Sequence, residues 1–126
     1  MRNPDQLRFA KSHEWIDADG TVGISDHAQH EITDVVFVEL PKVGRDVKAG
    51  DAIAIVESVK AAFDIYAPVA GKIVKVNTDV VKNPAVVNQS PYDKGWFFQI
   101  QMSQPEERNK LMSSADYQKS LEADVH

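Results

Sequence analysis

The segment that decides the fold runs from Ala52 to Tyr66 and reads Ala-Ile-Ala-Ile-Val-Glu-Ser-Val-Lys-Ala-Ala-Phe-Asp-Ile-Tyr. Two short runs rich in β-branched and aromatic residues, 52–56 and 63–66, flank a central part that contains Lys60. Such runs favour strands, and two of them so close in sequence predict an antiparallel pair. We therefore expect Lys60 at or near the turn of a hairpin.

Further strand-like runs lie on both sides of this pair, and turn formers bound each of them. These runs are residues 35–40, 72–76 and 96–102. Nearer the N-terminus, residues 14–17 and 21–24 flank Ala18-Asp19-Gly20, in which the Asp-Gly step supplies the positive φ of a hairpin turn. Short strands at these spacings are typical of a sandwich or barrel, so we expect a mainly β fold.

Three segments carry helix signals, in the form of capping serines or a proline in the first turn. They are residues 25–30, residues 113–122, and a segment that opens at Pro105 and has Leu111 and Met112 on its apolar face. We see no linker between the strands and these helices. Residues 1–126 are therefore expected to form a single domain.

Composition excludes several classes of protein. The net charge of −5 and the absence of a basic run argue against a nucleic-acid partner. The chain has no cysteine, which excludes disulfides, thiolate catalysis and cysteine metal sites. No apolar stretch approaches the ~20 residues of a membrane helix. The polar N-terminus resembles neither a signal peptide nor a transit peptide, so we expect a cytoplasmic protein, or a matrix protein if a presequence was removed.

Lys60 is the residue with the clearest chemical potential. A lysine in a hairpin turn stands clear of the surface, where a modifying enzyme can reach its amine while the strands hold the backbone fixed. An amide formed there would turn the side chain into the base of a long tether, which raises the effective concentration of its load at several active sites. The alternative is an ordinary solvated surface lysine.

The wider pattern resembles the H proteins of the glycine cleavage system over nearly the whole chain. Eight segments carry the resemblance in order: Ser12-His13-Glu14-Trp15, residues 22–29, residues 35–41, Val56-Glu57-Ser58-Val59-Lys60-Ala61, residues 66–71, Val76-Asn77, residues 87–92, and Gly95-Trp96. The resemblance implies that Lys60 carries lipoic acid. Related biotin carriers place methionine on both sides of their lysine, whereas Val59 and Ala61 stand here, which favours lipoyl over biotin.

The same resemblance implies a fold and a set of partners. The fold would be a barrel-sandwich hybrid of two small antiparallel sheets, with an N-terminal hairpin and a short C-terminal helix. The chain would be a monomeric, non-catalytic carrier. Its arm would take an aminomethyl group from the pyridoxal-phosphate glycine decarboxylase to the tetrahydrofolate-dependent aminomethyltransferase, and electrons to the FAD-containing dihydrolipoyl dehydrogenase. A lipoyl-attaching enzyme would load it.

Three residues are implied as the resting place of the loaded arm, namely Ser12, Glu14 and Asp64. Carboxylates and a hydroxyl are suitable partners for the cationic amine of that load. The alternative is that Glu14 and Asp64 are outward-facing strand residues of a half-exposed sheet.

One departure from the family pattern lies just before the strand at residues 35–40. H proteins commonly have Leu-Gly where Ile32-Thr33 stand here, and some carry a histidine in place of Glu31. Threonine reaches positive φ less easily than glycine, so we expect the backbone that enters this strand to differ locally. The details of arm docking depend on this segment.

Other readings remain open. His27 and His30, at i,i+3, could bind a metal ion, but no third ligand is placed beside them, and we expect none. Trp15, Trp96 and the pair Phe97-Phe98 are expected to be core anchors. Two alternative functions are an H-like protein that donates lipoyl groups to 2-oxoacid dehydrogenases, and an unmodified β-sandwich interaction module.

Overall fold

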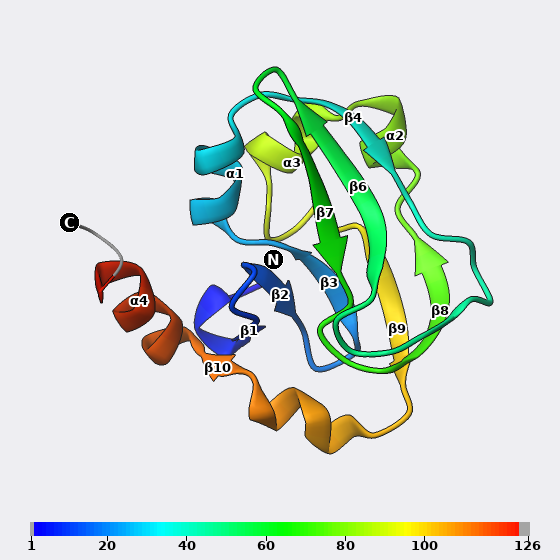
Figure 1. Cartoon of the computed structure of the whole chain (residues 1–126), viewed down its shortest axis with the longest axis vertical. Helices are drawn as coiled ribbons and strands as arrows, with labels where there is room; N and C mark the ends of the chain where they lie inside the picture. Colours follow the sequence, from blue (N-terminus) through cyan, green and yellow to red (C-terminus); the bar gives the residue numbers. More distant parts are fainter. Residues whose placement is uncertain (1, 124–126) are drawn as a thin grey trace.

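Residues 52–66 form the expected hairpin in a computed structural model that describes residues 2–123. Strand β6 (Ala52–Ser58) pairs antiparallel with β7 (Ala62–Tyr66), and β4 (Val35–Glu39) pairs with the other edge of β6. These strands make a three-stranded sheet in the order β4-β6-β7. The turn between β6 and β7 lies at one end of the molecule, near α1 and the start of β4 (Figure 1).

The second sheet has seven antiparallel strands in the order β10-β1-β2-β3-β9-β8-β5. Its strands are β1 (Arg8–Phe9), β2 (Glu14–Ile16), β3 (Thr21–Ile24), β5 (Asp46–Val47), β8 (Gly71–Val76), β9 (Phe98–Met102) and β10 (Met112–Ser113). The mainly β fold with two antiparallel sheets is confirmed, and the sheets are not closed into a barrel. Strands β1, β5 and β10, of two residues each, were not predicted because so short a run carries no periodic signal.

The N-terminal hairpin of β2 and β3 is also confirmed. Its turn needs glycine at position 20 for two reasons. Gly20 has a φ of 88°, and a Cβ there would lie 1.9 Å from the carbonyl oxygen of Ile100. Strand β9 begins at Phe98, two residues later than predicted. The carbonyl of Trp96, just before it, accepts a hydrogen bond from the Asn77 side chain at 2.8 Å.

Two of the three helix predictions are confirmed. They are α1 (Asp26–Ile32), capped by the Ser25 hydroxyl, and α4 (Ser114–Ala123). The segment opened by Pro105 is a 3₁₀ helix, η2 (Pro105–Lys110), and Met112 lies in β10, so the expected apolar helix face is wrong. The remaining helices are η1 (Pro4–Gln6), α2 (Asp79–Lys82) and α3 (Ala85–Gln89). No helix within residues 2–123 is long and apolar enough to cross a membrane.

The core consists of two clusters. The larger fills the space between the two sheets and includes Phe97 and Phe98, which are fully buried as predicted. The smaller, here called the tryptophan cluster, consists of Leu7, Phe9, Trp15 and Tyr117, with Trp96 partly buried against it. Because α4 contributes Tyr117, this cluster attaches the C-terminal helix to the outer face of the seven-stranded sheet.

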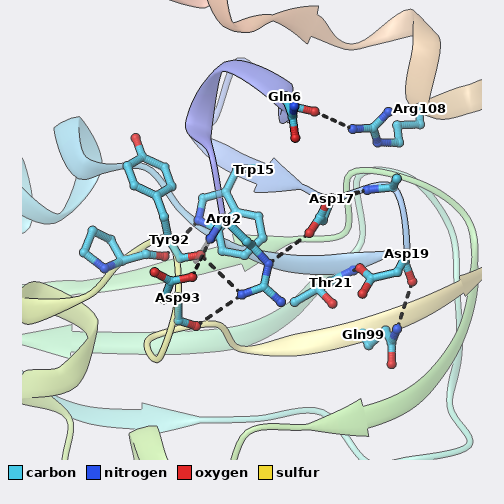
Figure 2. Close-up of polar contacts among 12 residues, drawn as sticks. Arg2, Gln6, Trp15, Asp17, Asp19, Thr21, Tyr92, Asp93, Gln99 and Arg108 are labelled. Atoms are coloured by element: carbon cyan, nitrogen blue, oxygen red, sulfur yellow. Dashed lines mark hydrogen bonds and ion pairs between the residues drawn. The ribbon is translucent and has the colours of Figure 1, made fainter.

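Arg2 covers the tryptophan cluster from outside. Its guanidinium carbon lies 5.2 Å from the centre of the Trp15 ring, and its Nε contacts Asp17 Oδ2 at 3.0 Å. Its backbone N–H donates to Asp93 Oδ1 at 2.7 Å (Figure 2). The cation over the ring and the two carboxylates tie the N-terminal segment to the β2–β3 hairpin and to the loop before β9.

Thr33, between α1 and β4, has a φ of 66° and a ψ of −152°. This region of backbone conformation is almost restricted to glycine and costs about 1–3 kcal/mol for other residues. Thr33 itself adopts the positive φ that glycine reaches more easily. The strain must be offset by the contacts that surround this residue.

The change Thr33→Gly is expected to raise the free energy of unfolding by about 1 kcal/mol. Glycine relieves the strain, and its larger unfolded-state entropy offsets only about 0.5–1 kcal/mol of that gain. Urea unfolding measures the difference. A matched change in the opposite sense is Gly50→Ala. Gly50 has a φ of 91°, and an added Cβ would meet no heavy atom within 4 Å beyond its chain neighbours, so backbone strain alone should lower stability. A Thr33→Gly variant less stable than the parent would contradict the assignment of strain.

Candidate functional site

The turn between β6 and β7 is organised by one hydroxyl. Ser58 Oγ accepts from the backbone N–H of Lys60 at 3.1 Å and of Ala61 at 3.2 Å. The N–H of Ser58 donates to the carbonyl of Ala61 at 2.8 Å, which closes the turn. A serine that bonds to the backbone two and three residues onward is a recognised turn signal, and it was overlooked in the sequence. The backbone of Lys60 is therefore fixed, while its side chain is exposed.

A cleft of about 200 Å³ lies close to this turn. Its walls come from both sheets and α1: Ser12, His13, Ile24, Ala28, Glu31, Ile32, Val56, Phe63, Asp64 and Ile65. The Nζ of Lys60 lies 3.3 Å from the carbonyl oxygen of Glu31, one of these residues. The structure thus brings Ser12 and Asp64, two of the three predicted docking residues, to one cleft beside the lysine.

Glu14, the third predicted residue, is buried behind Ser12 with only 1% of its surface exposed. Its Oε1 accepts from the Ser12 hydroxyl, and its Oε2 accepts from the backbone N–H of Tyr66 at 3.0 Å. The reading of Glu14 as an outward-facing residue is therefore wrong. For Asp64 that reading holds in part, because the side chain is exposed and also lines the cleft.

Burial raises the pKa of the Glu14 carboxyl above its ordinary value, and the hydrogen bonds from Ser12 and Tyr66 offset only part of this shift. The folded protein therefore holds the Glu14 proton to a higher pH than the unfolded chain does. Stability from this group is present below the ordinary pKa of 4.5 and is lost as pH rises through the folded-state pKa. At neutral pH the buried carboxylate is a net cost to the fold.

The change Glu14→Gln is therefore expected to stabilise the protein at neutral pH. A glutamine keeps both contacts, with its oxygen accepting from Tyr66 and its amide donating to Ser12. The gain should shrink as pH falls through the ordinary pKa of 4.5, because below it the carboxyl is protonated in both the folded and the unfolded state. Urea midpoints at several pH values measure it, with Glu39→Gln on the exposed face of β4 as control. An advantage that grows as pH falls would refute the assignment.

His13 is a cleft residue that the sequence did not single out beyond its place in the Ser-His-Glu segment. Its φ is 78°, and its Nδ1 lies 2.7 Å from the hydroxyl of Tyr117. That hydroxyl lies 2.6 Å from Ser25 Oγ, the N-cap of α1. Burial raises the pKa of Tyr117 to about 12, so the phenol stays protonated at neutral pH. His13 and Tyr117 are 104 residues apart, so the sequence alone showed no sign of this contact.

His27 and His30 are not brought together with a third ligand. The Nε2 of His27 lies 3.8 Å from Glu31, and that of His30 lies 3.7 Å from Asp26. Across the part of the chain that the structure describes, no three histidine, cysteine, aspartate or glutamate side chains converge as metal ligands would. His27 is half-buried and His30 is exposed, and each lies near a carboxylate one helical turn away.

Comparison with known proteins gives a consistent result. Residues 7–124 match the sequence model of the family described as glycine cleavage H-protein. A glycine cleavage system H protein of Deinococcus deserti is 54% identical over 117 residues, covering 93% of this chain and 96% of that protein. One of Carboxydothermus hydrogenoformans is 48% identical, covering 94% of each chain.

The fold agrees with the sequence comparison. The crystal structure of a glycine cleavage system H protein from Mycobacterium marinum matches with a TM-score of 0.86 at 36% identity, covering 95% of this chain and 99% of that one. The match therefore covers nearly the whole fold. The chain belongs to the glycine cleavage H-protein family.

Proposed function

We propose that Lys60 carries a covalently attached lipoic acid and that the chain serves as the lipoyl carrier of the glycine cleavage system. One observation carries the assignment of the residue. Lys60 stands exposed in a turn whose backbone is fixed by Ser58, beside a cleft that contains Ser12 and Asp64. Membership of the H-protein family supports the function.

Attachment requires the Lys60 amine to reach an activated lipoyl carboxyl in the attaching enzyme. The amine, once deprotonated, forms an amide with that carboxyl carbon, and the activating group departs with its bonding electrons. Within residues 2–123, the Nζ of Lys60 donates one hydrogen bond, at 3.3 Å, to the carbonyl of Glu31. So long and exposed a contact is weak, so the amine can leave it for an enzyme at little cost.

The cleft has the chemistry that the end of a loaded arm requires. Its apolar walls, Ile24, Ile32, Val56 and Ile65, suit a hydrocarbon chain and a sulfur ring. When attached, the lipoyl group supplies a disulfide that accepts an aminomethyl group and two electrons. The cleft would receive the ammonium of that load at the Asp64 carboxylate and at the Ser12 hydroxyl.

Ser12 is held in place for this task by Glu14, to which it donates a hydrogen bond. The buried carboxylate therefore adds negative charge behind the hydroxyl without itself lining the cleft. A cation close to Ser12 would offset the cost of that buried charge, which supports a binding role for the pair. Glu14 thus acts through Ser12 in this proposal.

The proposed partners follow from membership of the H-protein family. The pyridoxal-phosphate glycine decarboxylase loads the arm, the tetrahydrofolate-dependent aminomethyltransferase unloads it, and the FAD-containing dihydrolipoyl dehydrogenase restores the disulfide. Each must bind the carrier briefly, which small polar interfaces allow. The carrier itself supplies position and protection, whereas the bond-making groups belong to the enzymes.

Intact-mass measurement tests the proposal directly. Protein purified from lipoate-replete cells is expected to gain the mass of one lipoyl group, and peptide mapping should place it on Lys60. A chain that never gains this mass would show an unmodified interaction module instead. A lipoylated chain that supports no glycine–bicarbonate exchange with purified decarboxylase would point to the lipoyl-donor alternative.

A further inference from the structure

The segment that joins α1 to β4 is held from α3 by one side chain, Asn88. Its Oδ1 accepts from the backbone N–H of Val35 at 2.9 Å, and its Nδ2 donates to the carbonyl of Thr33 at 2.8 Å. The Nδ2 also donates to Gln29 Oε1 at 3.0 Å. An N–H on one side and a carbonyl on the other fix which end of the amide points where. The two bonds bracket Asp34 from both sides.

The bracketed segment in turn holds the Lys60 turn. The carbonyl of Asp34 accepts from the N–H of Val59 at 3.0 Å. Val59 immediately precedes Lys60, and its own side chain is 68% exposed, so this backbone contact is its anchor. Asn88 on α3 therefore holds residues 33–35 through two hydrogen bonds, and residue 34 holds the Lys60 turn through the hydrogen bond that Val59 donates.

The position of residues 33–35 depends on the Asn88 hydrogen bonds because the backbone of Thr33 is strained. A threonine at φ 66° tends to relax towards negative φ, which would rotate the peptide that follows and move the carbonyl of Asp34. Glycine at this position would adopt the same conformation without strain. The bond from Asn88 to the Thr33 carbonyl opposes the relaxation at the strained residue itself.

We propose that Asn88 is a positioning residue for the modified lysine: by holding residues 33–35, it sets the direction in which the turn presents Lys60 to the attaching enzyme. The proposal rests on lipoylation of Lys60. Among the described residues, the side-chain hydrogen bonds of Asn88 reach Gln29, Thr33 and Val35, none of which lines the cleft, so Asn88 acts through Asp34 and Val59. Misplacing a reacting amine by about 1 Å can cost up to 100-fold in rate.

The sharpest variant is Asn88→Asp, which is nearly isosteric. One carboxylate oxygen still accepts from Val35, but the other faces the Thr33 carbonyl and repels it. Asn77→Asp is the matched control for loss of stability. The Asn77 Nδ2 donates to the carbonyls of Lys94 and Trp96 at 2.7 and 2.8 Å, so this change also removes two donors to backbone, in the loop before β9.

Two measurements separate positioning from stability. The first is the rate of lipoyl transfer by purified lipoate ligase with lipoate and ATP, followed by intact mass under conditions where every variant is folded. We expect kcat/KM for Asn88→Asp to fall about tenfold and for Asn77→Asp to stay within about twofold of the parent. The second is amide hydrogen exchange of Val59 in the unmodified chain, which should accelerate only in Asn88→Asp.

Rescue completes the test. In the double variant Asn88→Asp, Thr33→Gly, glycine adopts the positive φ without strain, so part of the lost transfer rate should return, while the carboxylate at position 88 still repels the carbonyl of residue 33. Transfer at the parental rate by Asn88→Asp, or an equal loss in Asn77→Asp, would overturn the proposal while leaving lipoylation established. If the parent chain accepts no lipoyl group, the proposed function fails and this inference fails with it, whatever the exchange of Val59.

Discussion

The change Lys60→Arg is expected to abolish lipoylation and all carrier activity while leaving the fold intact. An arginine stays protonated and cannot form the amide. The turn itself should persist, because Ser58 holds it through the backbone of Lys60 and Ala61 and makes no use of the lysine side chain. Intact mass after incubation with the attaching enzyme, together with a thermal melt, measures both parts of the expectation.

The matched control is Lys75→Arg, another exposed lysine, on β8 of the other sheet. This variant should be lipoylated once, like the parent. If Lys60→Arg still gained one lipoyl group, another lysine would be the attachment site. If it lost its fold, the lysine would have a structural role that its exposure and its single long contact do not suggest.

Trp15→Ala should have the largest effect on stability of any change considered, a loss of about 3–5 kcal/mol. The indole is fully buried, donates from Nε1 to the carbonyl of Pro91 at 3.0 Å, and lies beneath Arg2. It packs so closely on Gly23 that a Cβ there would lie 2.6 Å from the ring. Removing it leaves a cavity, an unpaired carbonyl and a guanidinium without its aromatic partner.

A loss of this size is a large fraction of the stability of an ordinary domain, about 5–15 kcal/mol. Urea unfolding followed by far-UV circular dichroism measures it. The control is Trp15→Phe, which keeps an aromatic ring beneath Arg2 but removes the bond to Pro91, and should cost clearly less. An Ala variant within about 1 kcal/mol of the parent would mean that the tryptophan cluster contributes little to stability.

The sequence alone predicted those elements of the fold that depend on residues close together in the chain. The Ala52–Tyr66 hairpin, the β2–β3 hairpin with its Asp-Gly turn, and the Ser25 cap of α1 all rest on neighbours within a few residues. Helices α2 and α3 were missed because each is short and contains two adjacent valines, and β-branched residues favour strands by propensity. Burial of Val80 and Val87 against the core overrides that preference.

The site was harder to predict than the fold because its contacts join distant segments. An outward-facing position for Glu14 was the alternative to a docking role, but all three residues of β2 are buried. Ile16 faces the core between the sheets, whereas Trp15 faces the tryptophan cluster on the other side. Asn88 lies 53–59 residues from its partners, so only the folded chain shows that it holds the segment beside Lys60.

The position of the two tryptophans decides what an optical experiment can see. The chain has only two, and both Trp15 and Trp96 belong to or pack against the cluster on the outer face of the seven-stranded sheet. Intrinsic fluorescence therefore reports the loosening of that cluster and of helix α4. Local opening of the Lys60 turn would leave the emission spectrum unchanged, so a fluorescence melt of a turn variant can look fully native while its lysine is misdirected.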